Sequence, residues 1–148
     1  MEGASLGIPS MAVSLEAESK YHLSYSEEVS FLVAAEFTAQ IARLLLDRKL
    51  PMDVDLLKVD VPSDATVDTE WQLTRVSRQR YYQPVPPERV SWGERGLINY
   101  REAGEFEHEA EDTDVYVLRK KRMVSVSPLS LDLTSRVDFA ELERLMKA

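Results

Sequence analysis

Hydrophobic and polar positions fall into blocks along the chain, and the period of each block predicts a strand or a helix. Residues 6–15 are mostly apolar and small, which is typical of a strand in a parallel sheet covered on both faces. Residues 27–48 repeat their apolar positions every three or four residues, which predicts an amphipathic helix. Residues 55–62 predict a second strand. This order predicts a βαβ unit with parallel strands and a right-handed connection.

The helix expected over residues 27–48 has boundary signals at both ends. Ser26 is expected to cap its N-terminus, acidic residues occupy its first turn, and Pro51 ends it. Its expected apolar face comprises Phe31, Ala34, Ala35, Thr38, Ile41, Ala42, Leu45 and Leu46. We expect this face to pack on the sheet.

The two expected strands differ in their surroundings. The strand over residues 55–62 has an apolar face of Leu57, Val59 and Val61 and a polar face of Lys58 and Asp60. Five residues precede the strand over residues 6–15, so we expect it either at a sheet edge or beside an element that this sequence lacks. Residues 1–62 are therefore expected to form one compact α/β unit.

After residue 62 the pattern changes to short extended pieces. Residues 70–76 alternate and predict a third strand, which residues 77–84 continue in a basic and aromatic form. A turn at Arg95 and Gly96 precedes another short strand. Asp138 is expected to cap a final amphipathic helix through Phe139, Leu142, Leu145 and Met146. Residues 63–148 thus read as a β-rich extension with a terminal helix.

The stretch from Asp112 to Thr134 is the least generic part of the chain. A short apolar run, four consecutive basic residues and a strand-like run follow one another without a gap. Val124 and Val126 share one parity, and after Pro128 the apolar residues Leu129, Leu131 and Leu133 have the other. Because side chains alternate with a period of two, this shift predicts a kink or a change of neighbour near Pro128.

Composition narrows the classes of function. The 148 residues suit one soluble domain or part of a larger one, and a net charge of −8 disfavours a nucleic-acid surface. The absence of cysteine excludes disulfides, thiolate metal sites and a cysteine nucleophile. No apolar run is long enough to span a membrane and no leader pattern is present, so a cytoplasmic location is expected.

The two histidines suggest chemistry only weakly. His108 lies in residues 102–114, a stretch with seven carboxylate side chains. One interpretation is a metal site formed by Glu107, His108, Glu109 and Glu111; the other, which we favour, is a solvated acidic loop. His22 has no nucleophile-elbow sequence to accompany it, which disfavours a serine hydrolase.

Two clusters of basic residues could carry chemistry or could be structural. Arg75, Arg78, Arg80, Tyr81 and Tyr82 form a basic-aromatic patch. This patch suits a phosphate or a base, but we favour a strand edge that packs on a subunit or on the acidic stretch. The basic run from Arg119 to Arg122 is expected to be a solvated turn. With no glycine-rich phosphate loop present either, the residues alone assign no catalytic residue, cofactor-binding residue or metal ligand.

A set of segments in a fixed order resembles the C-terminal half of the SurE family, the survival-protein nucleotidases. These segments are Gly7–Leu15, Leu56–Pro62, Thr74–Arg75, Thr113–Tyr116 and Val124–Thr134. No one segment is decisive, but the set covers essentially the whole chain. Lys58-Val59-Asp60 stands where the family usually has Asn-x-Asn, Asp112 where it usually has glycine, and Lys121-Arg122 where a glycine usually precedes the last strand. These departures indicate a divergent member.

The resemblance implies that the family's catalytic residues lie in its N-terminal half. They are paired aspartates, a serine, an asparagine in a Ser-Gly-x-Asn context and a Ser-Gly-Thr loop, and they hold a divalent metal, Mg²⁺ or Mn²⁺, that activates a water and the phosphoryl group. This sequence has no counterpart to them, and residues 1–5 resemble the end of the helix after the Ser-Gly-Thr loop. No catalytic residue is carried over, and the catalytic half is expected on another chain, removed or absent.

The family resemblance also implies a fold and partners. The fold is the Rossmann-like portion of a three-layer α/β/α sheet, with residues 1–62 completing the sheet and residues 63–148 forming a β-hairpin arm and a C-terminal helix. The arm and the helix are expected to pair with another subunit in a homodimer or homotetramer. Asp112 to Leu118 then becomes a short helix capped by Thr113, where the pattern alone allows a strand.

The leading hypothesis is that the chain is the C-terminal segment of a metal-dependent phosphatase that acts on nucleoside 5′- and 3′-monophosphates. Its partners would be further copies of itself, a separate chain with the catalytic half, and the nucleotide, with neither a membrane nor a nucleic-acid polymer involved. The alternative is a non-catalytic assembly module that pairs through its arm.

Overall fold

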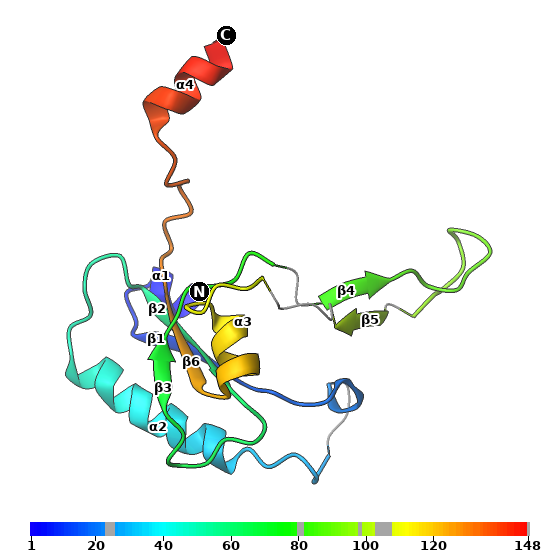
Figure 1. The fold of residues 1–148 in the computed structure, drawn as a ribbon, viewed down its shortest axis with the longest axis horizontal. Helices are drawn as coiled ribbons and strands as arrows, with labels where there is room; N and C mark the ends of the chain where they lie inside the picture. Colours follow the sequence, from blue (N-terminus) through cyan, green and yellow to red (C-terminus); the bar gives the residue numbers. More distant parts are fainter. Residues whose placement is uncertain (23–25, 80–81, 98, 103–107, 148) are drawn as a thin grey trace.

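The computed structural model describes residues 1–22, 26–79, 82–97, 99–102 and 108–147. A short helix, α1 (Glu2–Ser5), leads into β1 (Ser10–Leu15), and a turn, η1 (Ser19–Tyr21), separates β1 from the long helix α2 (Leu32–Asp47). Strand β2 (Leu56–Val61) follows, as the βαβ pattern predicts (Figure 1). Residues 2–5 are helical in α1, at the position where the family resemblance implies the end of a helix.

The main sheet has the strand order β1-β2-β6-β3, where β3 is Trp71–Leu73 and β6 is Val124–Leu129. β1 and β2 run parallel, with Ser14 paired to Asp60, so the predicted parallel pair is confirmed. β6 runs antiparallel to β2 and parallel to β3. β1 lies at one edge of this sheet, one of the two positions expected for it.

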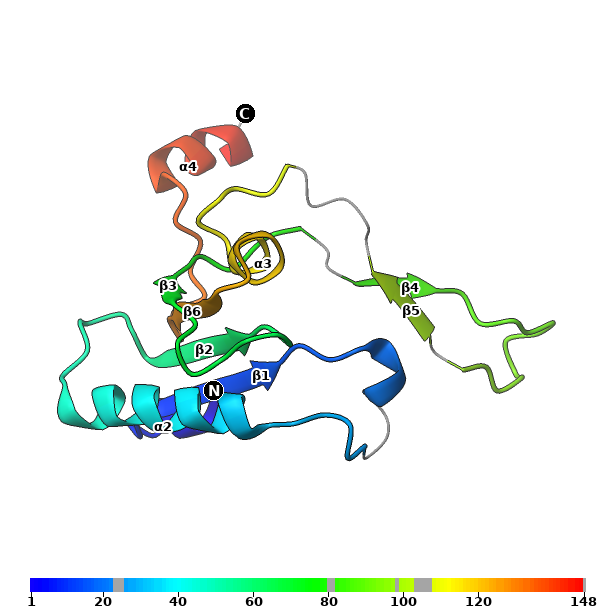
Figure 2. The same ribbon diagram turned by 60° about the horizontal axis from the view of Figure 1, so that its bottom comes forward.

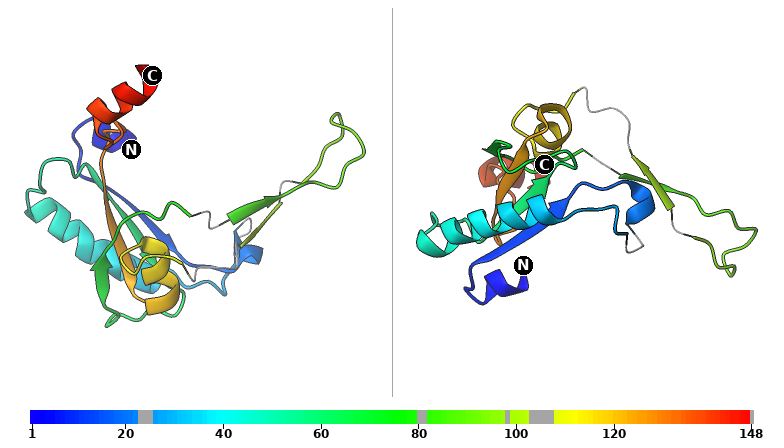
Figure 3. Two further views of the ribbon diagram at one scale, coloured as in Figure 1. Left: turned by 45° about the horizontal axis from the view of Figure 1, so that its top comes forward. Right: turned by 90° about the horizontal axis from the view of Figure 1, so that it is seen from below.

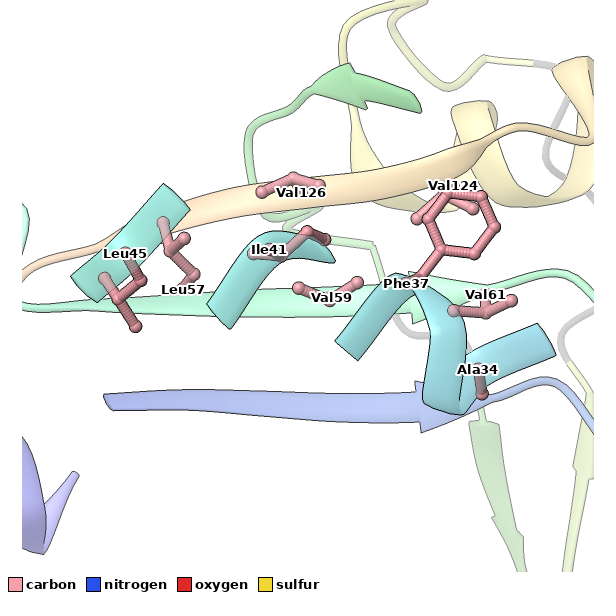
Figure 4. Packing of buried hydrophobic residues seen from close by; sticks show 9 residues of the cluster. All are labelled: Ala34, Phe37, Ile41, Leu45, Leu57, Val59, Val61, Val124 and Val126. Carbon is pink, nitrogen blue, oxygen red and sulfur yellow. The ribbon is translucent and has the colours of Figure 1, made fainter. Parts of the chain in front are cut away.

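One face of the sheet is covered by α2, and the apolar core lies between them (Figure 4). From α2 the buried residues are Ala34, Phe37, Ile41 and Leu45. From the sheet they are Leu57, Val59, Val61, Val124 and Val126. The apolar face expected for the second strand is therefore confirmed, because Leu57, Val59 and Val61 all point into this core.

The prediction for α2 was wrong in its start and in part of its buried face. The Ser26 side chain accepts a hydrogen bond from the Glu28 amide at 3.2 Å and so forms a local turn, while the helix begins at Leu32. Phe31 stays 62% exposed, whereas Phe37 is 3% exposed at the centre of the core. The buried positions of α2 are 34, 37, 41 and 45, a spacing of three or four residues that places one face of the helix on the sheet.

The opposite face of the sheet is covered by α3 (Asp114–Tyr116) and the π-helical turn η2 (Val117–Lys121), which completes three layers (Figure 2). The Thr113 side chain accepts a hydrogen bond from the Tyr116 amide at 3.4 Å, so the capped helix that the family resemblance implies is confirmed. Val117 is fully buried under this turn.

The prediction that residues 77–84 continue the third strand was wrong. β3 ends at Leu73, and the Arg75 amide donates to the carbonyl of Asp112 at 2.8 Å, which turns the chain away from β6. β4 (Tyr82–Val85) instead pairs antiparallel with β5 (Asn99–Glu102). The resulting two-stranded ribbon projects from the body of the molecule, as Figure 3 shows.

The chain leaves the sheet just after Pro128, where β6 ends at Leu129. An extended segment then carries α4 (Phe139–Lys147) away from the body (Figure 1). The Asp138 carboxylate accepts hydrogen bonds from the amides of Ala140 and Glu141 at 2.8 and 3.2 Å, which confirms the expected cap. In the described part of the chain, none of the helices has the length and hydrophobicity that crossing a bilayer requires.

Candidate functional site

A cavity of about 570 Å³ lies toward the carboxyl ends of β1 and β2, on the sheet face that α3 covers. Ser14 comes from β1, Lys58 and Asp60 from β2, and Asp114 from α3. Ligands of open α/β sheets bind outside the carboxyl ends of parallel strands, so this position is the one that the fold favours for a site.

Lys58 forms the centre of the polar cluster in this cavity. Its ammonium donates to the carboxylates of both Asp60 and Asp114, the latter at 2.8 Å. Ser14 donates its hydroxyl to the other oxygen of Asp60 at 2.8 Å. The side chains of Asp60 and Asp114 are 12% and 6% exposed, while that of Lys58 is 33% exposed. The polar face expected for β2 is thus confirmed.

Asp114 also fixes the loop that follows β3. Its carboxylate accepts hydrogen bonds from the backbone amides of Ser77 at 2.7 Å and Val115 at 2.8 Å. Ser77 in turn donates its hydroxyl to Glu109 at 2.7 Å, and Thr113 donates to the same carboxylate at 2.9 Å. One network therefore joins β2, the segment after β3 and α3.

Lys58 keeps its charge in this environment. Burial alone lowers the pKa of the Lys58 amine, but hydrogen bonds to Asp114 and Asp60 outweigh burial and raise the pKa above its usual value. The three ionised groups together carry one net negative charge. The cluster therefore suits hydroxyl or amine donors better than it suits an anion.

An aromatic group borders the same cavity. His22 and Tyr82 line it, and Tyr100 hydrogen-bonds to Nδ1 of His22. The rings of His22 and Tyr100 stack with centroids 6.0 Å apart, and those of Tyr82 and Tyr100 meet edge-on at 4.8 Å. Nε2 of His22 lies 3.0 Å from the carbonyl oxygen of Ala17. Because a carbonyl accepts only, Nε2 donates to the Ala17 carbonyl, while Nδ1 and the Tyr100 hydroxyl share the other hydrogen bond.

A second cluster lies at the end of β1 and corrects the prediction for the basic run. Arg119 and Arg122 both bind the carboxylate of Glu16, Arg122 at 2.7 Å, and Arg122 also binds Asp64. Ser63 donates its backbone amide and its hydroxyl to Glu16, each at 3.0 Å. The run is therefore no solvated turn, because two of its arginines hold β1, the loop after β2 and η2 together.

Glu16 makes the stability of the fold depend on pH. Burial raises the pKa of the Glu16 carboxyl, but hydrogen bonds from Arg122, Ser63 and Arg119 outweigh burial and lower the pKa from 4.5 to about 2. A carboxyl whose pKa is lower in the folded state stabilises the fold above pH 4.5, and this contribution is lost as the pH falls toward 2.

Replacing Glu16 with glutamine is accordingly expected to lower the free energy of unfolding at pH 7 by about 2 kcal/mol. Denaturant unfolding of the wild type and the variant between pH 7 and about pH 3 should show this difference shrinking below pH 4.5. Glu18, with a 70% exposed side chain paired to Lys20, provides the matched Glu18→Gln control. A deficit in Glu16→Gln that is unchanged at the acidic end would contradict this assignment.

The acidic stretch is only partly a solvated loop. Glu109 and Asp114 are buried within the network around Ser77, whereas His108 and Glu111 are exposed and Glu107 lies outside the described residues. Among the residues that the structure describes, no group of three or more histidine, aspartate or glutamate side chains forms a metal site. The proposed metal set from residues 107–111 thus gains no support from this part of the chain.

The basic-aromatic patch separates into two places. Arg75 pairs with Asp112 at 3.0 Å, in line with the favoured interpretation of packing on the acidic stretch. Tyr82 belongs to the aromatic border of the cavity, Arg78 is exposed, and Arg80 and Tyr81 lie outside the described residues. The sequence did not reveal that Lys58, Asp60 and Asp114 meet, because Asp114 lies 56 residues from Lys58.

Fold and cavity together define an α/β sheet protein with a polar pocket at the carboxyl ends of its parallel strands. Residues 1–83 match the family model described as "Survival protein SurE". The chain belongs to the SurE family.

Individual relatives agree with this assignment. The chain is 44% identical to "5′-nucleotidase SurE" of Thermococcus gammatolerans over 147 residues, which cover 99% of this chain and 54% of the relative. It is 43% identical to the protein of the same name from Methanocaldococcus jannaschii over 138 residues, covering 90% of this chain and 49% of that protein. The crystal structure of the SurE protein from Aquifex aeolicus superposes with a TM-score of 0.65 at 26% identity, covering 98% of this chain and 54% of that one. The chain thus spans about half the length of these relatives.

Proposed function

We propose that this chain is the C-terminal segment of a SurE-type metal-dependent phosphatase that hydrolyses nucleoside 5′- and 3′-monophosphates to a nucleoside and phosphate. The observation that carries the proposal is the match of essentially the whole chain to about half of a 5′-nucleotidase SurE. The cavity at the carboxyl ends of β1 and β2 supports it, because this is where such folds bind small ligands. A cytoplasmic location belongs to the same proposal.

The described residues do not fit the catalytic metal. No metal cluster is found among them, and the ammonium of Lys58 lies between the carboxylates of Asp60 and Asp114. A lysine held there by two aspartates competes with a divalent cation for the same oxygens. In this proposal the metal, Mg²⁺ or Mn²⁺, is held by the paired aspartates, serine and asparagine of the family's N-terminal half.

The purified chain is therefore expected to release no phosphate from a nucleoside monophosphate in the presence of Mg²⁺ or Mn²⁺. A colorimetric phosphate assay with and without a chelator measures this. Turnover by the isolated chain that the chelator abolishes would contradict the proposed division of the enzyme.

Within the proposal, this segment completes the sheet and supplies oligomer contacts. Residues 1–62 contribute the βαβ unit, and residues 63–148 contribute the ribbon and the terminal helix. Exposed apolar side chains near the ribbon and on the terminal helix support a role in a homodimer or homotetramer, since water-exposed apolar surface favours burial in an interface. In the segment that connects β4 and β5 they are Trp92 and Leu97, each 90% exposed. On α4 they are Leu145 and Met146, 71% and 78% exposed.

Replacing Leu145 and Met146 together with glutamate is expected to shift the protein to a smaller oligomer, because two charges would enter the apolar face of α4. Light scattering coupled to size-exclusion chromatography measures the molar mass. Arg144→Glu changes the charge of α4 off this face and serves as the control. An unchanged mass in the double variant would show that α4 is not an oligomer contact.

A further inference from the structure

We propose that the cavity between β1, β2 and α3 binds the nucleoside part of the substrate, with its ribose hydroxyls on Asp60 and Lys58 and its base on the aromatic border. This inference rests on the proposed function and adds to it the part of the nucleotide that this segment holds. It places the phosphoryl group outside the cluster.

The size and lining of the cavity fit this ligand. A volume of about 570 Å³ lies within the range of small-molecule sites and accommodates a nucleoside. Its polar groups converge from segments far apart in the sequence and include Ser14, Lys58 and Asp114. Apolar and aromatic surface from Leu15, Leu118 and Tyr82 lies beside them. A nucleoside combines sugar hydroxyls with an aromatic base, and the lining includes both polar and aromatic side chains.

The charge of the cluster selects the sugar rather than the phosphate. Lys58 is neutralised by two carboxylates, so the cluster carries one net negative charge and repels a phosphate dianion. Carboxylate oxygens accept more than one hydrogen bond each, so Asp60 retains acceptor capacity beside Ser14 and Lys58. An aspartate at the carboxyl end of a parallel strand is a common partner for ribose hydroxyls in nucleotide-binding sheets.

The aromatic border provides a surface for the base. Tyr82 is 42% exposed and lines the cavity, and its ring is supported edge-on by Tyr100. His22 holds Tyr100 on one side and the Ala17 carbonyl on the other, which fixes the border to the end of β1. A supported aromatic ring at a pocket edge stacks on any base, so this contact gives affinity with little base preference.

Calorimetric titration of the 148-residue chain with adenosine tests the inference without any catalytic step. Adenosine is expected to bind. 2′,3′-Dideoxyadenosine is expected to bind about tenfold more weakly, because it lacks the hydroxyls that would donate hydrogen bonds to Asp60. Tyr82→Ala should weaken adenosine binding by about tenfold through loss of stacking. Asp60→Asn, which keeps the shape of the side chain, should weaken adenosine binding but leave dideoxyadenosine binding unchanged, because the two changes remove the same contact.

Asp132→Asn, an exposed aspartate away from the cavity, is the matched control and should bind adenosine like the wild type. Thermal unfolding of each variant verifies that it is folded, and the dideoxyadenosine titration of the wild type needs no variant at all. The inference is wrong if the folded chain does not bind adenosine, or if the losses from Asp60→Asn and from the missing hydroxyls simply add. Phosphate release by the isolated chain, in contrast, bears on the proposed function and leaves the nucleoside site untouched.

Discussion

Replacing Asp114 with alanine is expected to lower the free energy of unfolding by about 3 kcal/mol, as measured by denaturant unfolding at neutral pH. Asp114 is 5% exposed and its carboxylate accepts from Lys58 and from the amides of Ser77 and Val115. Its removal leaves the Lys58 ammonium with one carboxylate instead of two and leaves two amides without their acceptor. Groups stranded in this way carry their full desolvation cost.

The neighbouring Asp112 provides the control for this prediction. Its side chain is 54% exposed and pairs with Arg75, whose side chain is 83% exposed. Such surface pairs contribute less than about 1 kcal/mol, so Asp112→Ala should be close to the wild type. Equal losses in the two variants would show that Asp114 is not the anchor between β2, the loop after β3 and α3.

Replacing Phe37 with alanine is expected to lower the free energy of unfolding by about 3–5 kcal/mol. Phe37 is 3% exposed and lies between α2 and the strands that carry Val61 and Val124 (Figure 4). Truncation removes an aromatic ring from the face of α2 that packs on the sheet and leaves a cavity in the core. Denaturant unfolding monitored by circular dichroism measures the loss.

Phe31→Ala is the matched control, since it makes the same chemical change on the same segment of chain. Phe31 is 62% exposed and precedes α2, so its truncation should change the free energy of unfolding by no more than about 0.5 kcal/mol. The apolar pattern alone placed Phe31 on the buried face. A large loss in Phe31→Ala with a small one in Phe37→Ala would therefore support the pattern and contradict the structure.

The parts of the fold that the sequence predicted are those set by the spacing of apolar residues and by the order of the elements along the chain. The apolar face of β2 and the cap at Asp138 each depend on residues close together in the chain. The parallel pair of β1 and β2 follows from the order of strand, helix and strand. The start of α2 was harder to place. Both Ser26 and Phe31 are followed by helix-compatible residues, and only packing against the sheet decides which turn is helical.

The site could be predicted less well, because its contacts join distant residues. Glu16 meets Arg122 across 106 positions and Lys58 meets Asp114 across 56. A run of basic residues or of acids looks solvated when it is considered alone. The structure shows that Arg119 and Arg122 serve one carboxylate and that Asp114 accepts from the ammonium of Lys58. The capped helix at Thr113 was predicted from the family resemblance and not from the spacing of apolar residues.

We propose that this chain supplies the C-terminal segment of a SurE nucleotidase and depends on residues outside itself for the metal. The most direct test places the chain in the Thermococcus gammatolerans 5′-nucleotidase SurE, where it replaces the 54% of that protein that it matches. Phosphate release from a nucleoside 5′-monophosphate is then measured with Mg²⁺ or Mn²⁺. We expect the chimera to release phosphate in a reaction that a chelator abolishes, and the chain alone to release none. A folded chimera without activity, or a chelator-sensitive activity of the chain alone, would contradict this proposal.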